Sequence, residues 1–194
     1  MNYPFLLGLA ISLLINGDFE KADPKDAGKP AGWDKPDGLG VVWKTGVIQM
    51  DTRVSEKAMV DQWTKVGLTQ WNIPKPAGNA IAETYGLSYY SDPMPVKSGQ
   101  TYRVSFDYKG PSGGGKVWVR GWGQYQGEKR RRWETFVNCR AQGDGWTHFE
   151  QEFHPTRARP EVTEMRVMLY AYYPPGVYCY DNVRIEEVSG LPSR

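Results

Sequence analysis

Apolar and polar residues alternate along several short stretches of the chain, and this period of two predicts β-strands with one buried face. The clearest stretch is residues 102–108, where every second residue is apolar or aromatic. The same pattern recurs in residues 117–120, 148–153, 166–172 and 177–183. The one helix that the pattern favours is short and covers residues 55–61, although residues 54–60 suit a strand equally well.

Segments rich in Gly and Pro separate these stretches and predict turns between the strands. They are residues 97–99, 111–115, 143–145 and 174–176. Because no crossover helices lie between the strands, we predict an all-β protein, an antiparallel β-sandwich. Residues 22–40, rich in Asp, Lys, Pro and Gly, are expected to form a long polar loop over one end of it.

The composition agrees with a turn-rich β protein and narrows the function classes. The chain has 194 residues with Gly 22, Pro 14, Trp 8, Tyr 12 and Phe 6. Lys+Arg 24 against Asp+Glu 22 leaves a net charge of +2, too even for binding nucleic acid or a membrane surface by bulk charge. No apolar run reaches the length of about 20 residues that spans a bilayer.

The chain divides into three parts by composition. Residues 1–12 are an apolar arm or the remnant of a leader, residues 13–188 form the sandwich, and residues 189–194 are a tail or linker. We expect a monomer. Cys139 and Cys179 are interpreted as two small core residues, with a single disulfide as the alternative.

Two motifs suggest ligands that their surroundings argue against. The sequence of residues 110–116 matches a phosphate-binding loop, but Val117 stands where the pattern needs Ser or Thr, and a strand follows instead of a helix. We therefore expect a hairpin loop there. Lys129, Arg130, Arg131 and Arg132 form a basic run that acidic residues flank, which is typical of a solvated hairpin tip.

Large aromatic and Arg side chains occupy the non-aliphatic face of two predicted strands. One strand carries Trp118, Arg120 and Trp122 opposite Val117 and Val119. The other carries Arg166, Met168, Tyr170 and Tyr172 opposite Val167, Leu169 and Ala171. Flat rings cover the apolar face of a pyranose, and Arg and Tyr hydrogen-bond its hydroxyls. We interpret this face as a glycan-binding surface with Trp71 or Trp63 at its edge; a second layer packed under a loop is the alternative.

Carboxylates suggest two further sites. Glu150 and Glu152 lie on one face of a predicted strand, about 6.6 Å apart along it, a separation that suits a glycosidase acid and base. The simpler interpretation is the solvent face of a half-buried strand.

Asp18, Glu20 and Asp181 are candidate calcium ligands, because calcium prefers carboxylate and carbonyl oxygens. They can meet only if the first and last strands lie side by side.

Several motifs together resemble carbohydrate-binding modules of the family 4, 9, 16 and 22 type, which are galactose-binding-domain-like jelly rolls. They are LLINGDFE at 13–20, Gly32-Trp33, PVKSGQTYRVSF at 95–106 and GVYCYDNV at 176–183. The resemblance covers residues 13–188, and the opening and closing motifs are specific only together. It implies a jelly-roll sandwich, a structural calcium at Glu20 and Asp181 with carbonyls near Asp18, and ligand contacts from residues 117–122, 166–172 and 63–85.

The resemblance also implies the function that we expect. The protein is expected to be a non-catalytic module that binds a polysaccharide or oligosaccharide of the β-glucan or xylan type. It is expected to be extracellular or at the cell surface, with a catalytic domain of a larger parent protein as a further partner. A single-domain glycan-active enzyme using Glu150 and Glu152 is the first alternative, and a structural or adhesive module is the second.

Overall fold

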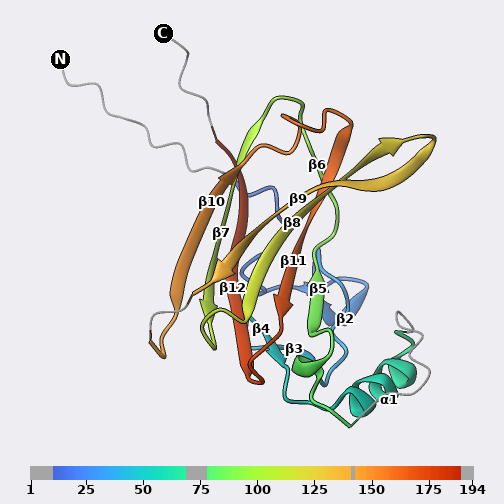
Figure 1. Cartoon of the computed structure of the whole chain (residues 1–194), viewed down its shortest axis with the longest axis vertical. Coiled ribbons are helices and arrows are strands. Elements are labelled where there is room, and N and C mark those ends of the chain that lie inside the picture. The colour runs from blue at the N-terminus through green and yellow to red at the C-terminus, as the bar shows by residue number, and fades with distance from the viewer. Residues whose placement is uncertain (1–10, 69–77, 141–142, 189–194) are drawn as a thin grey trace, which may run out of the picture.

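Two antiparallel β-sheets pack face to face in the computed structural model, which describes residues 11–68, 78–140 and 143–188 (Figure 1). One sheet, named here the β7 sheet, has the order β10-β7-β12-β4-β3. The other, the β8 sheet, has the order β5-β11-β8-β9, with β6 also paired to β11. The predicted antiparallel sandwich of jelly-roll type is therefore confirmed.

The strand bounds are as follows. The β7 sheet contains β3 (Val41–Lys44), β4 (Val47–Asp51), β7 (Thr101–Lys109), β10 (Thr147–Phe153) and β12 (Val177–Val188). The β8 sheet contains β5 (Leu87–Tyr90), β6 (Met94–Pro95), β8 (Gly115–Tyr125), β9 (Glu128–Cys139) and β11 (Val162–Ala171).

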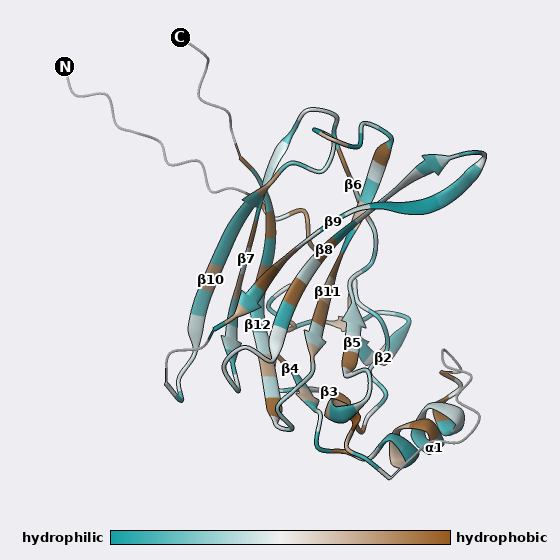
Figure 2. Cartoon of the chain, viewed as in Figure 1, coloured by the Kyte–Doolittle hydropathy of each residue, from teal (hydrophilic) through white to brown (hydrophobic). Residues whose placement is uncertain are grey.

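Alternating apolar side chains from both sheets form one core, as the period of two predicts. Val104 and Phe106 on β7 are fully buried, and so are Val119 on β8 and Val167 on β11. Figure 2 shows brown and teal bands alternating along these strands. Because the inner face is occupied by aliphatic residues, the Arg and aromatic side chains between them on β8 and β11 lie on the outer face of the sheet.

The alternation that predicts a strand over residues 177–183 does not continue through the whole of β12. A bulge between Asp181 and Arg184 shifts the register against β7, and Asn182 there has φ +50°. Before the bulge the core side chains are therefore Tyr178 and Tyr180, and after it they are Val183 and Ile185. An extra residue in one strand exchanges the odd- and even-numbered side chains between the inner and outer faces of the sheet. The alternation of apolar and polar residues does not reveal where such a bulge occurs.

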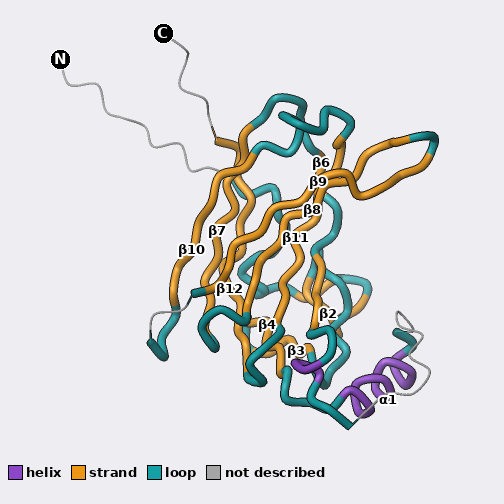
Figure 3. The backbone as a smooth tube through the Cα atoms, viewed as in Figure 1, coloured by secondary structure: helices purple, strands orange, loops and turns teal. Residues whose placement is uncertain are grey.

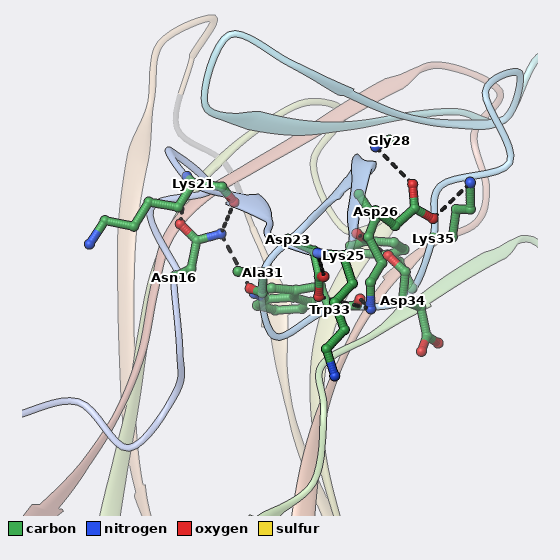
Figure 4. A network of polar contacts seen from close by, with 12 residues as sticks. Asn16, Lys21, Asp23, Lys25, Asp26, Gly28, Ala31, Trp33, Asp34 and Lys35 are labelled. Atoms are coloured by element: carbon green, nitrogen blue, oxygen red, sulfur yellow. Dashed lines mark hydrogen bonds and ion pairs between the residues drawn. The ribbon is translucent and has the colours of Figure 1, made fainter.

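Residues 22–40 hold more structure than the predicted loop. They contain a small hairpin of β1 (Ala22–Asp23) and β2 (Asp26–Pro30). Asn16 anchors it, because its amide donates to the carbonyls of Lys21 and Ala31 and accepts from the Lys21 N–H (Figure 4). Below it, the buried Trp33 donates from Nε1 to the Ile15 carbonyl.

The predicted short helix exists and is longer than expected. Helix α1 spans Glu56–Val66, and a single 3-10 turn follows at Ile81–Glu83 (Figure 3). Ser55 caps α1 by accepting from the Ala58 N–H at 3.3 Å, and Gly67 ends it with φ +77°. These are the side-chain cap and the left-handed glycine that a helix start and stop need.

The two glycine- and arginine-rich motifs have different outcomes. The 110–116 segment is not a hairpin loop, because β7 and β8 lie in different sheets and the segment connects them. The basic run does follow a hairpin turn, between β8 and β9. Its charges are paired within the described part of the chain: Lys129 with Glu164, Arg130 with Glu128, Arg131 with Glu134 and Arg132 with Glu161.

Cys139 and Cys179 are both free thiols, Cys139 being buried and Cys179 half-buried. Burial raises the pKa of each thiol, which keeps both protonated at neutral pH. The interpretation as two core residues is confirmed for Cys139.

Candidate functional site

The predicted aromatic face lies on the outer side of the β8 sheet. Strands β8 and β11 are neighbours, and their register places Trp118 beside Met168 and Arg120 beside Arg166. The inner aliphatic residues of both strands are buried, so the two outer rows form one continuous surface. The parity argument from the sequence holds for this part of the sheet.

A pocket of about 420 Å³ opens on this surface. Its base comes from β8, β11 and β5, and its side walls come from α1 and the loops around it. We call it the aromatic pocket, and it is lined by Asp37, Val41, Trp63, Leu68, Tyr85, Gly86, Leu87, Ser88, Tyr90, Lys116, Trp118, Arg120, Met168 and Tyr170. Its volume falls in the range of small-ligand sites, about 300–1,000 Å³.

Asp37 builds one wall of the aromatic pocket. Its Oδ1 accepts the backbone N–H groups of Leu39, Gly40 and Val41 at 2.7–3.0 Å. Its Oδ2 lies 3.3 Å from Trp63 Nε1, which donates to it. Asp37 is 5% exposed, so this buried carboxylate both shapes the loop before β3 and joins it to the indole ring on α1.

Aromatic contacts hold other parts of the pocket lining. The rings of Trp63 and Tyr85 lie 6.2 Å apart, and Tyr170 donates its hydroxyl to the Tyr85 carbonyl. Trp118 packs on Phe136 of β9 with ring centroids 4.5 Å apart, and the Lys116 ammonium lies over both rings. The rings are therefore fixed in place before any ligand binds.

A second, more open depression of about 490 Å³ adjoins the aromatic pocket and shares Tyr90 and Arg120 with it. We call it the basic hollow, and it is lined by Asp34, Tyr90, Arg120, Trp122, Arg131 and Arg166. Arg120 connects the two sites, because one of its terminal nitrogens donates to the Tyr90 hydroxyl at 2.7 Å and its guanidinium lies 5.1 Å from the Trp118 ring.

Most of the predicted binding residues come together here. Trp118, Arg120 and Tyr170 line the aromatic pocket, while Arg120, Trp122 and Arg166 line the basic hollow. Tyr172 follows the end of β11, stacks on Tyr170 with centroids 6.1 Å apart, and lines neither site. Of the two edge residues, Trp63 is in the pocket and Trp71 lies outside the described residues.

Several lining residues were missed from the sequence. Lys116 shares the parity of Trp118, and Arg131 follows the β8–β9 turn, so strand pairing would have found both. Asp34 and Asp37 stand in an irregular segment, where no period relates them to the sheet.

Glu150 and Glu152 lie far from this surface in the fold. They are exposed on β10, an edge strand of the β7 sheet, and line neither the aromatic pocket nor the basic hollow. Glu152 forms an ion pair with Arg103 on β7 at 2.7 Å. This is the arrangement of a solvated strand face.

The predicted calcium ligands gather where β12 meets the start of the chain. Burial raises the pKa of the Asp181 carboxyl, and the nearby carboxylates of Asp107, Glu20 and Asp18 raise it further. The Glu20 carboxylate also packs against Gly46, whose φ of +70° and lack of Cβ leave room for it.

Side chains alone do not complete a metal site. Within the described residues, no group of three or more His, Cys, Asp and Glu side chains is arranged to hold a metal ion. A cation here would need backbone carbonyls as well as Glu20 and Asp181, which is the ligand set that the resemblance implies.

Comparison with known proteins gives matches to solved structures only. No family model and no curated protein matches the chain. Three solved structures are similar over most of their length. A structure titled "CBM4 structure and function" has 15% identity and a TM-score of 0.48, covering 90% of this chain and 99% of that one. A structure titled "Family 16 Carbohydrate Binding Module-2" has 12% identity and a TM-score of 0.48, covering 89% of this chain and 98% of that one.

The third is the Stig cyclase Fisc from Fischerella sp. TAU, with 15% identity and a TM-score of 0.48, covering 94% of this chain and 100% of that one. Carbohydrate-binding modules are thus among the solved structures to which this chain is similar in fold. The ligand has to be inferred from the residues of the site. Within the described residues, no helix has the length and hydrophobicity to cross a bilayer.

Proposed function

We propose that this protein binds a glycan chain, without cleaving it, in the aromatic pocket and the basic hollow. The observation that carries the proposal is a fixed set of rings with unpaired donors. The Trp118 side chain is half-buried, and its Nε1–H is itself buried and has no hydrogen-bond partner within the described part of the chain. A pyranose offers both an apolar face for the ring and hydroxyl oxygens for the donor.

The ligand should be a chain rather than a single sugar. The aromatic pocket and the basic hollow share Tyr90 and Arg120, so they form one path across β11, β8 and β9. Each has room for a small ligand of its own. Successive sugar rings can then lie along the path, which favours a linear polysaccharide such as a β-glucan or a xylan.

Calcium belongs to this proposal as a structural ion. Glu20 and Asp181 would hold it with backbone carbonyls near Asp18, and the ion would offset the burial and the carboxylate repulsion that raise the Asp181 pKa. The cluster lies on a different part of the sandwich from the aromatic pocket, so the ion would stabilise the fold without touching the glycan. Extracellular use, where calcium is plentiful, and attachment to a catalytic domain fit the same role.

Titration calorimetry against soluble xylan and β-glucan oligosaccharides tests the proposal. Trp118→Ala should weaken binding by about 5- to 150-fold, since losing a large stacked ring costs about 1–3 kcal/mol. Trp146→Ala is the matched control, because Trp146 is 48% exposed and lies outside both sites. If both variants keep the melting temperature and bind like the parent, or if no glycan binds the parent, the proposal is wrong.

A further inference from the structure

The basic hollow carries an excess of positive charge for a site that binds neutral sugar. Three guanidinium groups, from Arg120, Arg131 and Arg166, line it, with Asp34 as the one carboxylate in the lining. A neutral pyranose gains little from so many fixed cations, whereas an anionic group gains both charge and hydrogen bonds.

The nearby carboxylates do not neutralise these three groups. Glu134, which lies just outside the lining, forms ion pairs with two of them. Its Oε2 is 3.3 Å from Arg120 Nε and 3.6 Å from a terminal nitrogen of Arg131. Asp34 faces Arg166, but burial raises the pKa of Asp34, and Asp92 raises it further. Glu164 is already paired with Lys129 at 2.6 Å. Two carboxylates therefore stand against three guanidinium groups.

The hydrogen-bonding state of these groups points the same way. Arg166 has no hydrogen-bond or ion-pair partner in the described part of the chain. The Nε–H of Arg120 is buried and, despite the ion-pair distance to Glu134, makes no hydrogen bond there. The unpaired groups around the hollow are thus donors, and what is lacking is an acceptor.

Acceptor-only chemistry distinguishes the ligand. A sugar hydroxyl both donates and accepts, so it uses only half its capacity among donors. A carboxylate only accepts, and its two oxygens match the two parallel N–H groups of a guanidinium. We propose that the basic hollow binds the carboxylate of a uronic acid residue, so that the preferred ligand is an acidic glycan.

This inference rests on the proposed glycan binding and specifies its substrate class. Because the two sites share Tyr90 and Arg120, the uronic acid would lie next to the sugar that stacks in the aromatic pocket. Trp122, also in the hollow, offers a ring for the apolar face of that acidic residue. The Arg side chains would then bind its carboxylate.

Titration calorimetry with matched oligosaccharides tests the assignment. The probes are xylo- and cello-oligosaccharides that carry one uronic acid, the same molecules with that carboxyl reduced to an alcohol, and sulfated counterparts. The acidic form should bind at least tenfold tighter than the reduced form. Arg166→Gln should remove most of this difference, because it should weaken binding of the acidic form much more than binding of the reduced form.

Arg157→Gln is the charge-matched control, since Arg157 is exposed and lines neither site, and it should keep the preference. Equal affinity for acidic and reduced probes, or an equal loss on both with Arg166→Gln, overturns the carboxylate subsite and leaves glycan binding standing. Tighter binding of a sulfated probe overturns the assignment to uronic acids. If none of the probes binds, the proposed function itself fails.

Discussion

At the scale of single residues, Asp37 holds the loop before β3 and the Trp63 indole together in the wall of the aromatic pocket. Three backbone N–H groups and one indole N–H point at its carboxylate, which is nearly inaccessible to solvent. Its backbone carbonyl also accepts from the Gln62 amide on α1 at 2.6 Å. Removing the carboxylate would leave buried donors without acceptors, and such unmet donors are costly.

Asp37→Ala should therefore lower the free energy of unfolding by about 2–4 kcal/mol and weaken glycan binding through the displaced Trp63. Urea titration measures the first effect and calorimetry the second. Asp144→Ala, in an exposed turn, serves as the control and should change neither. Unchanged stability in Asp37→Ala would show that the loop holds Trp63 without this carboxylate.

At the scale of elements, the two sheets are tied together directly beneath the aromatic pocket. Tyr180 on β12 is fully buried and donates its hydroxyl to the carbonyl of Tyr170 on β11 at 2.6 Å. Tyr170 in turn lines the pocket and donates to Tyr85. The position of one pocket residue is thus set from the opposite sheet.

Tyr180→Phe should lower the free energy of unfolding by about 1–2 kcal/mol, because it removes one buried hydrogen bond and keeps the ring. Thermal or urea unfolding measures this. Tyr125→Phe is the control, since Tyr125 is 38% exposed near the β8–β9 turn. A Tyr180→Phe protein as stable as its parent would contradict the role given to this contact.

Much at this scale was predictable from the sequence, and the exceptions have physical reasons. Alternation on β8 and β11 reveals the outer face because a strand sends successive side chains to opposite sides. It fails on β12, where Asn182 forms a bulge, and it does not show whether residues 110–116 form a hairpin or cross between sheets. Asp34 and Asp37 lie in an irregular segment whose position depends on tertiary contacts, so no hydrophobic period predicts where their side chains lie.

At the scale of the whole molecule, the cluster around Asp181 joins the start of the chain to its last strand. The pKa of Asp181 is raised, so without a cation the folded state binds more protons than the unfolded chain. Stability should therefore rise as the pH falls from neutrality toward this pKa. A bound calcium ion would reverse the trend, because it favours the ionised carboxylate.

We expect calcium to raise the melting temperature of the parent at neutral pH and to lose this effect as Asp181 becomes protonated. Asp181→Asn should melt higher than the calcium-free parent and should not respond to calcium. Scanning calorimetry with calcium and with chelator at several pH values gives both results. If the melting temperature of the parent protein does not change with calcium, the proposal of a structural calcium ion is wrong.

The central claim is that a sugar ring stacks on Trp118 and satisfies its indole N–H. The most direct test is the indole region of a ¹H–¹⁵N spectrum, with the Trp118 signal assigned through Trp118→Phe. On titration with the tightest-binding oligosaccharide, the Trp118 signal should shift downfield as its N–H gains an acceptor, while the Trp146 signal stays in place. Saturable binding that leaves the Trp118 signal unmoved would contradict the claim and place the glycan elsewhere on the molecule.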